Sequence, residues 1–320
     1  MQNGALYVIV PCYNEEEVLK QTLERLGEKM HSLLERGLIN KKSRIVLIND
    51  GSKDRTWDII REENAKSRWV LGICLSRNYG HQNALMAGLM FAVDKCDVTI
   101  SLDADLQDDP DAIDKMLEKY HNEACEIVYG VREDRSSDTF FKRFTAKSFY
   151  RVTNALGGQV VHDHADFRLM SKRALEELAG FHEYNMFLRG LVPMLGFKTD
   201  IVLYTRQKRM AGVTKYPFLK MISFAIEGIT SLSIRPLRFI SGIGLFILLI
   251  SAGMLLYSFI QQMLGNTIRG WSSTIISIWA LGGIQMLCIG VVGEYIGKIY
   301  METKHRPRYI IEEFLDDRAE

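Results

Sequence analysis

The stretch Val98-Thr99-Ile100-Ser101-Leu102-Asp103-Ala104-Asp105 decides the fold class, because an apolar strand runs directly into two carboxylates. Val98–Leu102 has the length and the β-branched character of a buried strand. Two carboxylates on one turn repel each other unless a cation lies between them, and Mg²⁺ or Mn²⁺ takes such oxygen ligands. An Asp-x-Asp pair is common on protein surfaces. Its place directly after a buried strand is therefore what indicates a metal site.

On both sides of this stretch, short apolar segments alternate with helical ones. Such alternation is typical of an α/β fold with a mainly parallel sheet, whose ligands bind beyond the carboxyl ends of the strands. The expected strands are Leu6–Val10, Arg44–Ile48, Trp69–Leu75, Val98–Leu102 and Glu126–Tyr129, and the expected helices are Glu15–Arg36, Thr56–Ala65, His81–Val93 and Pro110–Tyr120.

Polar residues follow three of these strands at the point where each strand ends. They are Pro11-Cys12-Tyr13-Asn14-Glu15, Asn49-Asp50-Gly51-Ser52-Lys53-Asp54 and Asp103-Ala104-Asp105-Leu106-Gln107-Asp108. Each loop alone is ordinary turn or helix-cap chemistry. Because the ends of parallel strands share one edge of the sheet, we expect the three loops to converge on one ligand.

Two later segments, Phe239–Ile260 and Thr274–Tyr295, are almost free of charge. Each has about the 20 residues that a helix needs to cross a bilayer, and the alternative is a pair of buried core helices. Their only acidic residue is Glu294, so a membrane anchor is favoured over a transport path. Basic residues lie outside the pair, and the connection between the two segments holds only Arg269. The positive-inside rule then places both termini and the N-terminal region in the cytoplasm.

Composition excludes several classes of protein. The formal net charge of +1 gives no case for nucleic-acid binding. The five cysteines form no Cys-x-x-Cys pair, which argues against a zinc site and a disulfide framework and suits a reducing cytosol. The first residues lack the charged leader and the long apolar run of a signal peptide.

Several motifs together resemble the inverting family 2 glycosyltransferases, which have a GT-A fold. They are the three loops above with Val10, and Leu75-Ser76-Arg77-Asn78-Tyr79-Gly80. Later motifs are similar to the polyprenyl-phosphate hexosyltransferases, a branch that includes bactoprenol glucosyltransferases and is related to dolichyl-phosphate mannose synthases. These motifs are His164-Ala165-Asp166-Phe167-Arg168-Leu169-Met170, Ala211-Gly212-Val213-Thr214-Lys215-Tyr216-Pro217 and the two apolar segments. The resemblance covers nearly the whole chain.

The resemblance implies a metal-dependent enzyme of the plasma membrane. It would move a hexose or an N-acetylhexosamine from a nucleotide sugar, with UDP as the expected nucleotide, to a polyprenyl phosphate such as undecaprenyl phosphate. Transfer at the cytoplasmic face would serve cell-envelope glycans. The implied organisation is a catalytic domain over 1–215, a juxtamembrane segment over 216–236, two transmembrane helices over 237–300 and a cytoplasmic tail over 301–320. A homo-oligomer, such as a tetramer packed through the spans, is also implied.

The resemblance assigns roles to individual residues. Asp103 would face the ribose and the diphosphate, Asp105 would be the principal metal ligand with Gln107 beside it, and Asp166 matches the proposed catalytic base. A phosphate acceptor is already anionic, so Asp166 need not remove a proton and would instead orient groups or stabilise the cationic sugar. The alternative interpretation of Asp166 is a structural one, in which it caps a helix ahead of Ser171. The nucleoside pocket would be lined by Pro11, Tyr13 and Glu15, with Asp50 accepting a hydrogen bond from uracil and Ser52 nearby.

An anionic acceptor needs cations at the active edge. Arg132 and Arg209 are favoured by their positions in the family, and Lys142, Arg143 and Lys147 lie on the helix expected over Phe140–Leu156. Each of them alone is more often a solvated surface charge. Processive relatives carry Gln-x-x-Arg-Trp, which Gln207-Lys208-Arg209-Met210 lacks, and this points to a single transfer.

The segment Tyr216–Ser233 combines Phe218, Ile222 and Phe224 with two lysines, a pattern suited to a helix in the membrane interface. An ordinary helix packed on the domain is the alternative. We expect a chain cut before Arg235 to keep UDP-sugar binding. Two rival functions stay open: a GT-A enzyme with a protein or glycan acceptor, and a non-catalytic nucleotide-sugar-binding partner of a membrane flippase.

Overall fold

The computed structural model describes residues 4–105, 107–133, 164–183, 187–205, 235–264 and 271–316. The helix expected over 140–156 and the segment 216–233 lie outside these residues, together with Lys142, Arg143, Lys147 and Arg209. The chain divides into two compact units. One comprises 1–150, 159–217 and 306–320, and the other comprises 151–158 and 218–305.

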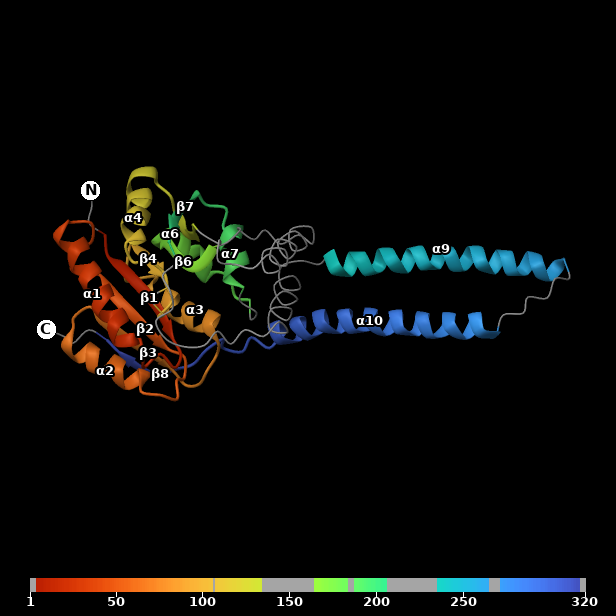
Figure 1. Ribbon diagram of the computed structural model, residues 1–320, viewed down its shortest axis with the longest axis horizontal. Coiled ribbons are helices and arrows are strands. Elements are labelled where there is room, and N and C mark those ends of the chain that lie inside the picture. Colours follow the sequence, from red (N-terminus) through yellow and green to blue (C-terminus); the bar gives the residue numbers. More distant parts are fainter. Residues whose placement is uncertain are drawn as a thin grey trace. The chain divides into compact units, whose positions relative to one another are not determined.

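The first unit is built on an eight-stranded sheet with the order β7-β5-β6-β4-β1-β2-β3-β8 (Figure 1). Parallel pairs join β1 to β2 and β4, β2 to β3, and β5 to β7, whereas β6 and β8 run antiparallel to their neighbours. The predicted α/β class is therefore confirmed, and the sheet is mixed, with a parallel centre formed by β4, β1, β2 and β3. The strands are β1 Leu6–Cys12, β2 Arg44–Asn49, β3 Val70–Leu75, β4 Val98–Ser101, β5 Ile127–Arg132, β6 His164–Ser171, β7 Thr199–Tyr204 and β8 Ile311–Leu315.

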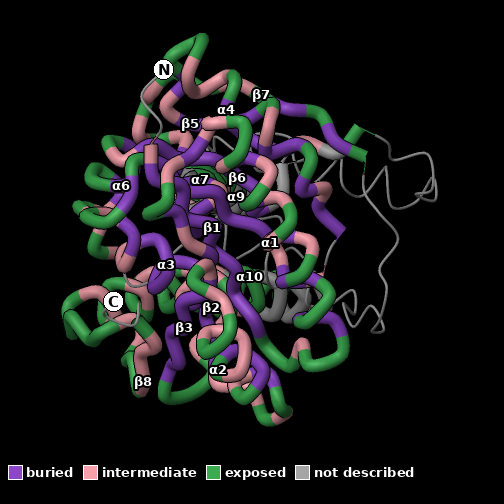
Figure 2. Tube along the Cα trace, turned by 90° about the vertical axis from the view of Figure 1, so that its left-hand side faces the viewer, coloured by how far each residue is buried: buried purple, intermediate pink, exposed green. Residues whose placement is uncertain are grey.

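Helices cover both faces of the sheet, because alternate side chains of each strand point to opposite faces. Leu6 and Val8 of β1 join a buried cluster that includes Leu19 of α1. On the other face α3 lies very close to the sheet: a Cβ atom on Gly88 would meet the side chain of Ile9 at 2.5 Å. Figure 2 shows the central strands as buried. The helices are α1 Leu19–Glu35, α2 Thr56–Lys66, α3 His81–Ala92, α4 Ala112–Glu123, α6 Lys172–Ala179 and α7 Leu188–Met194.

The first helix begins at Leu19, four residues later than expected, because the loop after β1 is held by the loop after β2. The N–H of Glu15 donates to Oγ1 of Thr56 at 2.9 Å, and the N–H of Glu16 donates to Oδ2 of Asp54 at 3.1 Å. These bonds keep the first turn out of the helix and bring two of the predicted loops side by side.

A cluster of charges joins α1 to α4. Nζ of Lys29 lies 2.7 Å from Oδ2 of Asp114 and also pairs with Asp111, while Arg36 pairs with the other oxygen of Asp114. Burial alone would raise the pKa of Asp114, but the hydrogen bonds from Lys29 and Arg36 outweigh burial and lower it. The cluster fastens α1 to α4.

The sequence did not predict β8, which lies in the segment expected to be a tail. It pairs antiparallel with β3, with Gly72 opposite Leu315 and Leu75 opposite Ile311. Residues 306–320 therefore belong to the same unit as the sheet.

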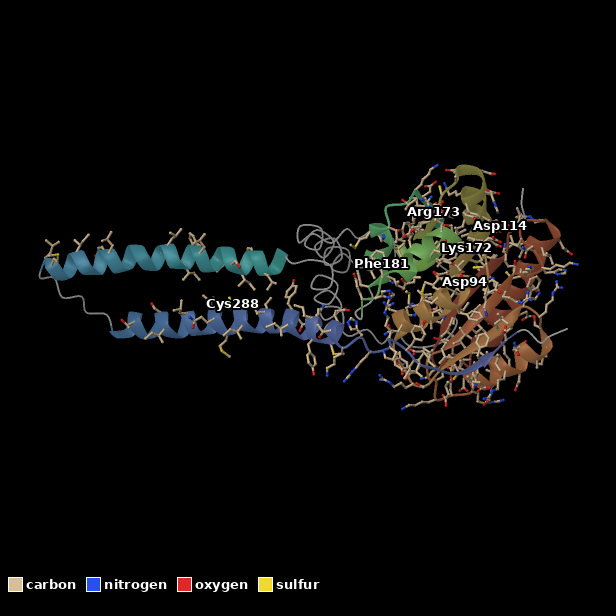
Figure 3. The ribbon with its side chains drawn as sticks, turned by 180° about the vertical axis from the view of Figure 1, so that it is seen from behind. Asp94, Asp114, Lys172, Arg173, Phe181 and Cys288 are labelled. Carbon is tan, nitrogen blue, oxygen red and sulfur yellow. The ribbon has the colours of Figure 1, made fainter. Side chains whose placement is uncertain are left out.

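The second unit holds two long helices, α9 Arg235–Met263 and α10 Trp271–Thr303. They lie side by side as an antiparallel hairpin (Figure 1), and Figure 3 marks Cys288 on α10. Among the described residues, one helical segment, Leu281–Thr303, is long and apolar enough to cross a membrane by its length and composition. A second span in α9 stays a prediction.

Candidate active site

A cleft of about 350 Å³ opens at the carboxyl ends of β1, β2 and β4. The three predicted loops meet there. The predicted residues that line it are Pro11, Tyr13, Glu15, Asp50, Asp103, Asp105 and Asp166. Cys12, Asn78, Gly80, His81, Ala84, Ala104 and Arg189 complete the lining.

Three predicted residues lie elsewhere in the structure. Oγ of Ser52 accepts the N–H of Asn14 at 3.0 Å, so it holds the loop after β1 rather than lining the cleft. Gln107 is buried, and its N–H donates to Oδ1 of Asp105 at 3.2 Å, which stabilises the acidic turn. Arg132 is the last residue of β5 and lies opposite Tyr204 in the register with β7.

Asp50 fastens the loop 76–80 to the end of β2. Its carboxylate accepts the N–H of Tyr79 at 2.7 Å and the N–H of Gly80 at 2.9 Å. Burial raises the pKa of Asp50, while these two N–H groups act in the opposite direction. Gly51, at φ +63°, allows the close approach, because a Cβ atom there would lie 2.4 Å from the carbonyl carbon of Arg77. Loop 76–80 therefore enters the cleft directly over the second predicted loop.

The end of β4 concentrates negative charge. Asp108 is buried and accepts the hydroxyl of Tyr204 at 2.5 Å. Desolvation in the cleft raises the pKa of Asp103, His81 opposes that rise, and the charges of Asp108, Asp166 and Asp105 add to it. Carboxylates gathered in this way present hard oxygen donors whose repulsion a divalent cation relieves. The donor set of Asp103 and Asp105 therefore fits Mg²⁺ or Mn²⁺.

Asp166 is buried on β6, the strand that pairs with β4, and it lines the cleft near Asp103. Cationic and amide groups surround its carboxylate. Arg189 of α7 approaches with Nε 3.3 Å from Oδ1 and Nη2 3.2 Å from Oδ2. Nε2 of His81 lies 3.2 Å from Oδ2, and Nη2 of the buried Arg168 lies 3.6 Å from Oδ1. Nε2 of Gln82 donates to Oδ2 at 3.3 Å.

These contacts set the charge of Asp166. Burial alone would raise its pKa, but the hydrogen bond with His81 and the charges of Arg189 and Arg168 hold the pKa far below its usual range. The carboxylate is therefore ionised throughout the physiological range and is a weak base. The helix-cap alternative is wrong, because Ser171 itself caps α6 by accepting the N–H of Ala174 at 3.1 Å.

Sequence reasoning missed His81, Gln82 and Arg189. The first two directly follow the motif that ends at Gly80, so extending that motif into α3 would have found them. His81 also lies 3.7 Å from Asp103, which makes it a bridge between the two acidic groups of the cleft. Arg189 lies in the short helix α7 and follows no strand, so strand-end reasoning offered no signal for it.

A second group of ligand-type side chains among the described residues consists of Glu123, Cys125 and Asp200, whose ligand atoms lie within 4.8 Å of one another. Lys119 forms ion pairs with both carboxylates of this group. Because the lysine already compensates their charge, the group is explained without a metal.

Comparison with known proteins assigns the family. The model of Glycosyl transferase family 2 matches residues 7–179, and the model of the GtrB C-terminal hairpin matches residues 235–299. The uncharacterized glycosyltransferase YkoT of Bacillus subtilis is 53% identical over 307 residues, which cover 96% of this chain and 91% of YkoT. The bactoprenol glucosyl transferase of Shigella phage SfV is 40% identical over 306 residues, which cover 95% of this chain and 97% of the phage protein. The chain therefore belongs to glycosyl transferase family 2 and is a glycosyltransferase.

Proposed function

We propose that this enzyme transfers a hexose or an N-acetylhexosamine from a UDP-sugar to a polyprenyl phosphate, with inversion at the anomeric carbon. The observation that carries the proposal is the similarity along the whole chain to proteins named bactoprenol glucosyl transferase. The cleft supports it, since an acidic end suits a metal-bound diphosphate and the Asp166 wall carries cations suited to an incoming anion.

The donor would lie along the ends of β1, β2 and β4 of a GT-A domain. Pro11, Tyr13 and Glu15 would enclose the nucleoside, and Asp50 would face the base while it holds loop 76–80. Asp103 and Asp105 would hold Mg²⁺ or Mn²⁺, which neutralises the charge that develops on the leaving diphosphate. Ser52 and Gln107 would act through Asn14 and Asp105, whose positions they stabilise.

Asp166 would stabilise positive charge on the sugar rather than accept a proton from the acceptor. The acceptor phosphate is already anionic, and a carboxylate held by Arg189, His81 and Arg168 is a poor proton acceptor. An ionised Asp166 stabilises positive charge on the sugar in a transition state that resembles an oxocarbenium ion. It also fixes the position of Arg189 at the wall of the cleft. This geometry favours the orienting role over the role of a base.

The acceptor sets the cellular location. A polyprenyl tail resides in the bilayer, so we place the enzyme in the plasma membrane, anchored by α9 and α10, with the catalytic domain and both termini in the cytoplasm. A homo-oligomer assembled through this hairpin is part of the proposal. The acceptor phosphate would be bound by cations from Arg132, Lys142, Arg143, Lys147 and Arg209.

To test the proposal, the full-length enzyme in lipid nanodiscs is incubated with undecaprenyl phosphate and each of a panel of nucleotide sugars. The lipid product is then identified by mass spectrometry. A glycosylated lipid phosphate made from one UDP-sugar is expected. Product formed only on a protein or glycan acceptor would overturn the choice of acceptor. Tight UDP binding without product on any acceptor would favour the non-catalytic flippase partner.

A further prediction concerns the carboxylates of Asp103 and Asp105 at the end of β4, which we propose bind a divalent metal ion. We expect chelation to abolish turnover, Mg²⁺ or Mn²⁺ to restore it, and Asp105→Asn to lower kcat at least about a hundredfold, because charge on the leaving group is then left uncompensated. Asp94→Asn is the control, since Asp94 is exposed on the turn after α3 (Figure 3). Full turnover in EDTA would reject the metal role.

A further inference from the structure

The C-terminal strand β8 is fastened to the catalytic sheet on both of its faces. Oε2 of Glu313 accepts the indole N–H of Trp57 at 3.0 Å and pairs with Arg61, both on α2. The next side chain, Phe314, points to the opposite face, where its ring centroid lies 4.7 Å from that of Phe91 on α3. Glu313 and Phe314 therefore clamp β8 between the two helices that flank β3.

The segment just before β8 reaches the cleft loop itself. The carbonyl oxygen of Ile310 accepts the N–H of Ser76 at 3.0 Å, and Ser76 is the first residue of loop 76–80. Within the loop, Oγ of Ser76 lies 3.1 Å from the hydroxyl of Tyr79, and the guanidinium of Arg77 lies over the Tyr79 ring at 4.4 Å. A second anchor precedes Ile310: Nη2 of Arg308 donates to the carbonyl of Phe181 at 2.5 Å, at the end of α6 (Figure 3).

Loop 76–80 is thus held from two sides. Asp50 binds the N–H groups of Tyr79 and Gly80 from the cleft side, and Ile310 binds the N–H of Ser76 from the edge of the sheet. The loop presents Asn78 and Gly80 to the cleft. Removing either support leaves exposed loop residues to be ordered at the moment when a ligand binds, and that ordering costs affinity.

We propose that β8 is a positioning element of the donor site, with Glu313 and Phe314 as positioning residues: it holds loop 76–80 in the conformation that meets the nucleotide. The inference rests on the proposed function for the identity of the ligand. It assigns a role in donor binding to a strand that follows α10 and that lies outside both family matches, which cover residues 7–179 and 235–299.

The inference revises one expectation from the sequence. The sequence predicts that a chain cut before Arg235 still binds UDP-sugar through Asp50, Asp103 and Asp105. That chain lacks β8 and leaves both the outer edge of β3 and loop 76–80 without this support. We therefore expect the truncated chain to bind UDP more weakly, although every cleft residue is still present.

The test uses the full-length enzyme with the double variant Glu313→Gln/Phe314→Ala. The matched control is Ile311→Ala/Glu312→Gln, which makes the same kinds of change at two exposed positions of the same strand. We expect the first variant to raise the Kd for UDP and the KM for the donor about five- to tenfold, as for the loss of pre-organisation at one loop. The KM for polyprenyl phosphate and kcat at saturating donor should stay close to the parent values. The control should match the parent throughout.

Hydrogen exchange gives a readout that needs no ligand. Amides 77–80 should exchange faster in the Glu313→Gln/Phe314→Ala variant, while those of β1 and β2 keep their protection. Unchanged exchange in the loop together with an unchanged Kd for UDP would overturn the inference. An equal loss of protection in every strand would mean general destabilisation and would also overturn it. If the parent bound no UDP, the proposed donor would be wrong, and the exchange data alone would decide whether β8 holds the loop.

Discussion

At the scale of single residues, the wall of the cleft around Asp166 is governed by charge. Three cationic side chains and one amide surround a single buried carboxylate, and all of them approach within 3.6 Å. The carboxylate keeps these groups in place, and they in turn keep it ionised. A residue in this position can stabilise a cationic sugar at neutral pH without first losing a proton.

The first residue-scale prediction concerns Asp166→Asn. We expect kcat to fall by about a hundredfold or more, because the amide cannot stabilise positive charge in the transition state, while the Kd for UDP changes little. Single-turnover rates and calorimetry on the same preparation check both parts. A kcat within a few-fold of the parent would show that the charge of Asp166 is not used.

The second residue-scale prediction concerns how kcat depends on pH. Because the pKa of Asp166 is lowered, its carboxylate stays ionised well below the ordinary aspartate value of about 4. We compare the dependence of kcat on pH between about 5 and 8 in the parent enzyme and in Asp166→Asn. We expect Asp166 itself to contribute no ionisation to the parent profile in this range. Because the pKa values of His81 and Asp103 also depend on Asp166, only a titration in this range that NMR assigns to the carboxyl carbon of Asp166 itself would restore the general-base role.

At the scale of elements, α1 and α4 depend on the cluster of Lys29, Arg36, Asp111 and Asp114. The side chain of Lys29 is only 13% exposed, so losing Asp114 leaves a largely buried charge with Asp111, an exposed residue, as its remaining acidic partner in the cluster. The hydroxyl of Thr22 on α1 also donates to the carbonyl of Ala104 in the acidic loop at 2.7 Å, and α4 begins at Ala112, shortly after that loop. Their attachment is therefore a condition for the shape of the cleft.

We expect Asp114→Asn to destabilise the sheet unit by about 1.5–3 kcal/mol at neutral pH, the range for hydrogen bonds to charged groups. The pKa of Asp114 is lowered in the folded state, so its contribution is present above the unfolded value of about 3.9 and is lost as the pH falls through the folded pKa. The difference between variant and parent should then shrink below about pH 4. Unfolding at several pH values measures this, with the exposed Glu118→Gln on the same helix as control. Equal midpoints for the two variants at neutral pH would contradict the prediction.

At the scale of the whole molecule, local patterns in the sequence predicted the features that depend on neighbouring residues, such as individual strands and the polar loops that follow them. Alternating segments indicated the α/β class, and the polar strand ends together with the family resemblance identified seven of the fourteen described residues that line the cleft, including Asp50, Asp103 and Asp105. The antiparallel strands β6 and β8 were beyond this reasoning, because pairing between distant segments leaves no period in the sequence. His81 and Arg189 escaped for a related reason, since they reach the cleft from helices rather than from strand ends.

The proposed topology is testable in cells. In an otherwise native chain, Thr267→Cys lies in the connection between α9 and α10, and Ala319→Cys lies near the C-terminus. A membrane-impermeant maleimide added to intact cells should label the first and not the second, because both termini are proposed to be cytoplasmic. The parent chain reports any background from the native cysteines, four of which are buried. Labelling at both positions, or only at 319, would contradict the topology.

The position of β8 also sets the order in which the domain is completed during synthesis. The strand β3 ends at Leu75 and its partner β8 begins at Ile311, so 235 residues are translated between them. Translation proceeds at about 5–20 residues per second, so the outer edge of β3 stays unpaired for on the order of 10–50 seconds before β8 is synthesised. Both long helices emerge from the ribosome during this interval. An open edge of this kind invites pairing with other chains, so nascent chains stalled before residue 311 are the ones that we expect to aggregate or to recruit chaperones.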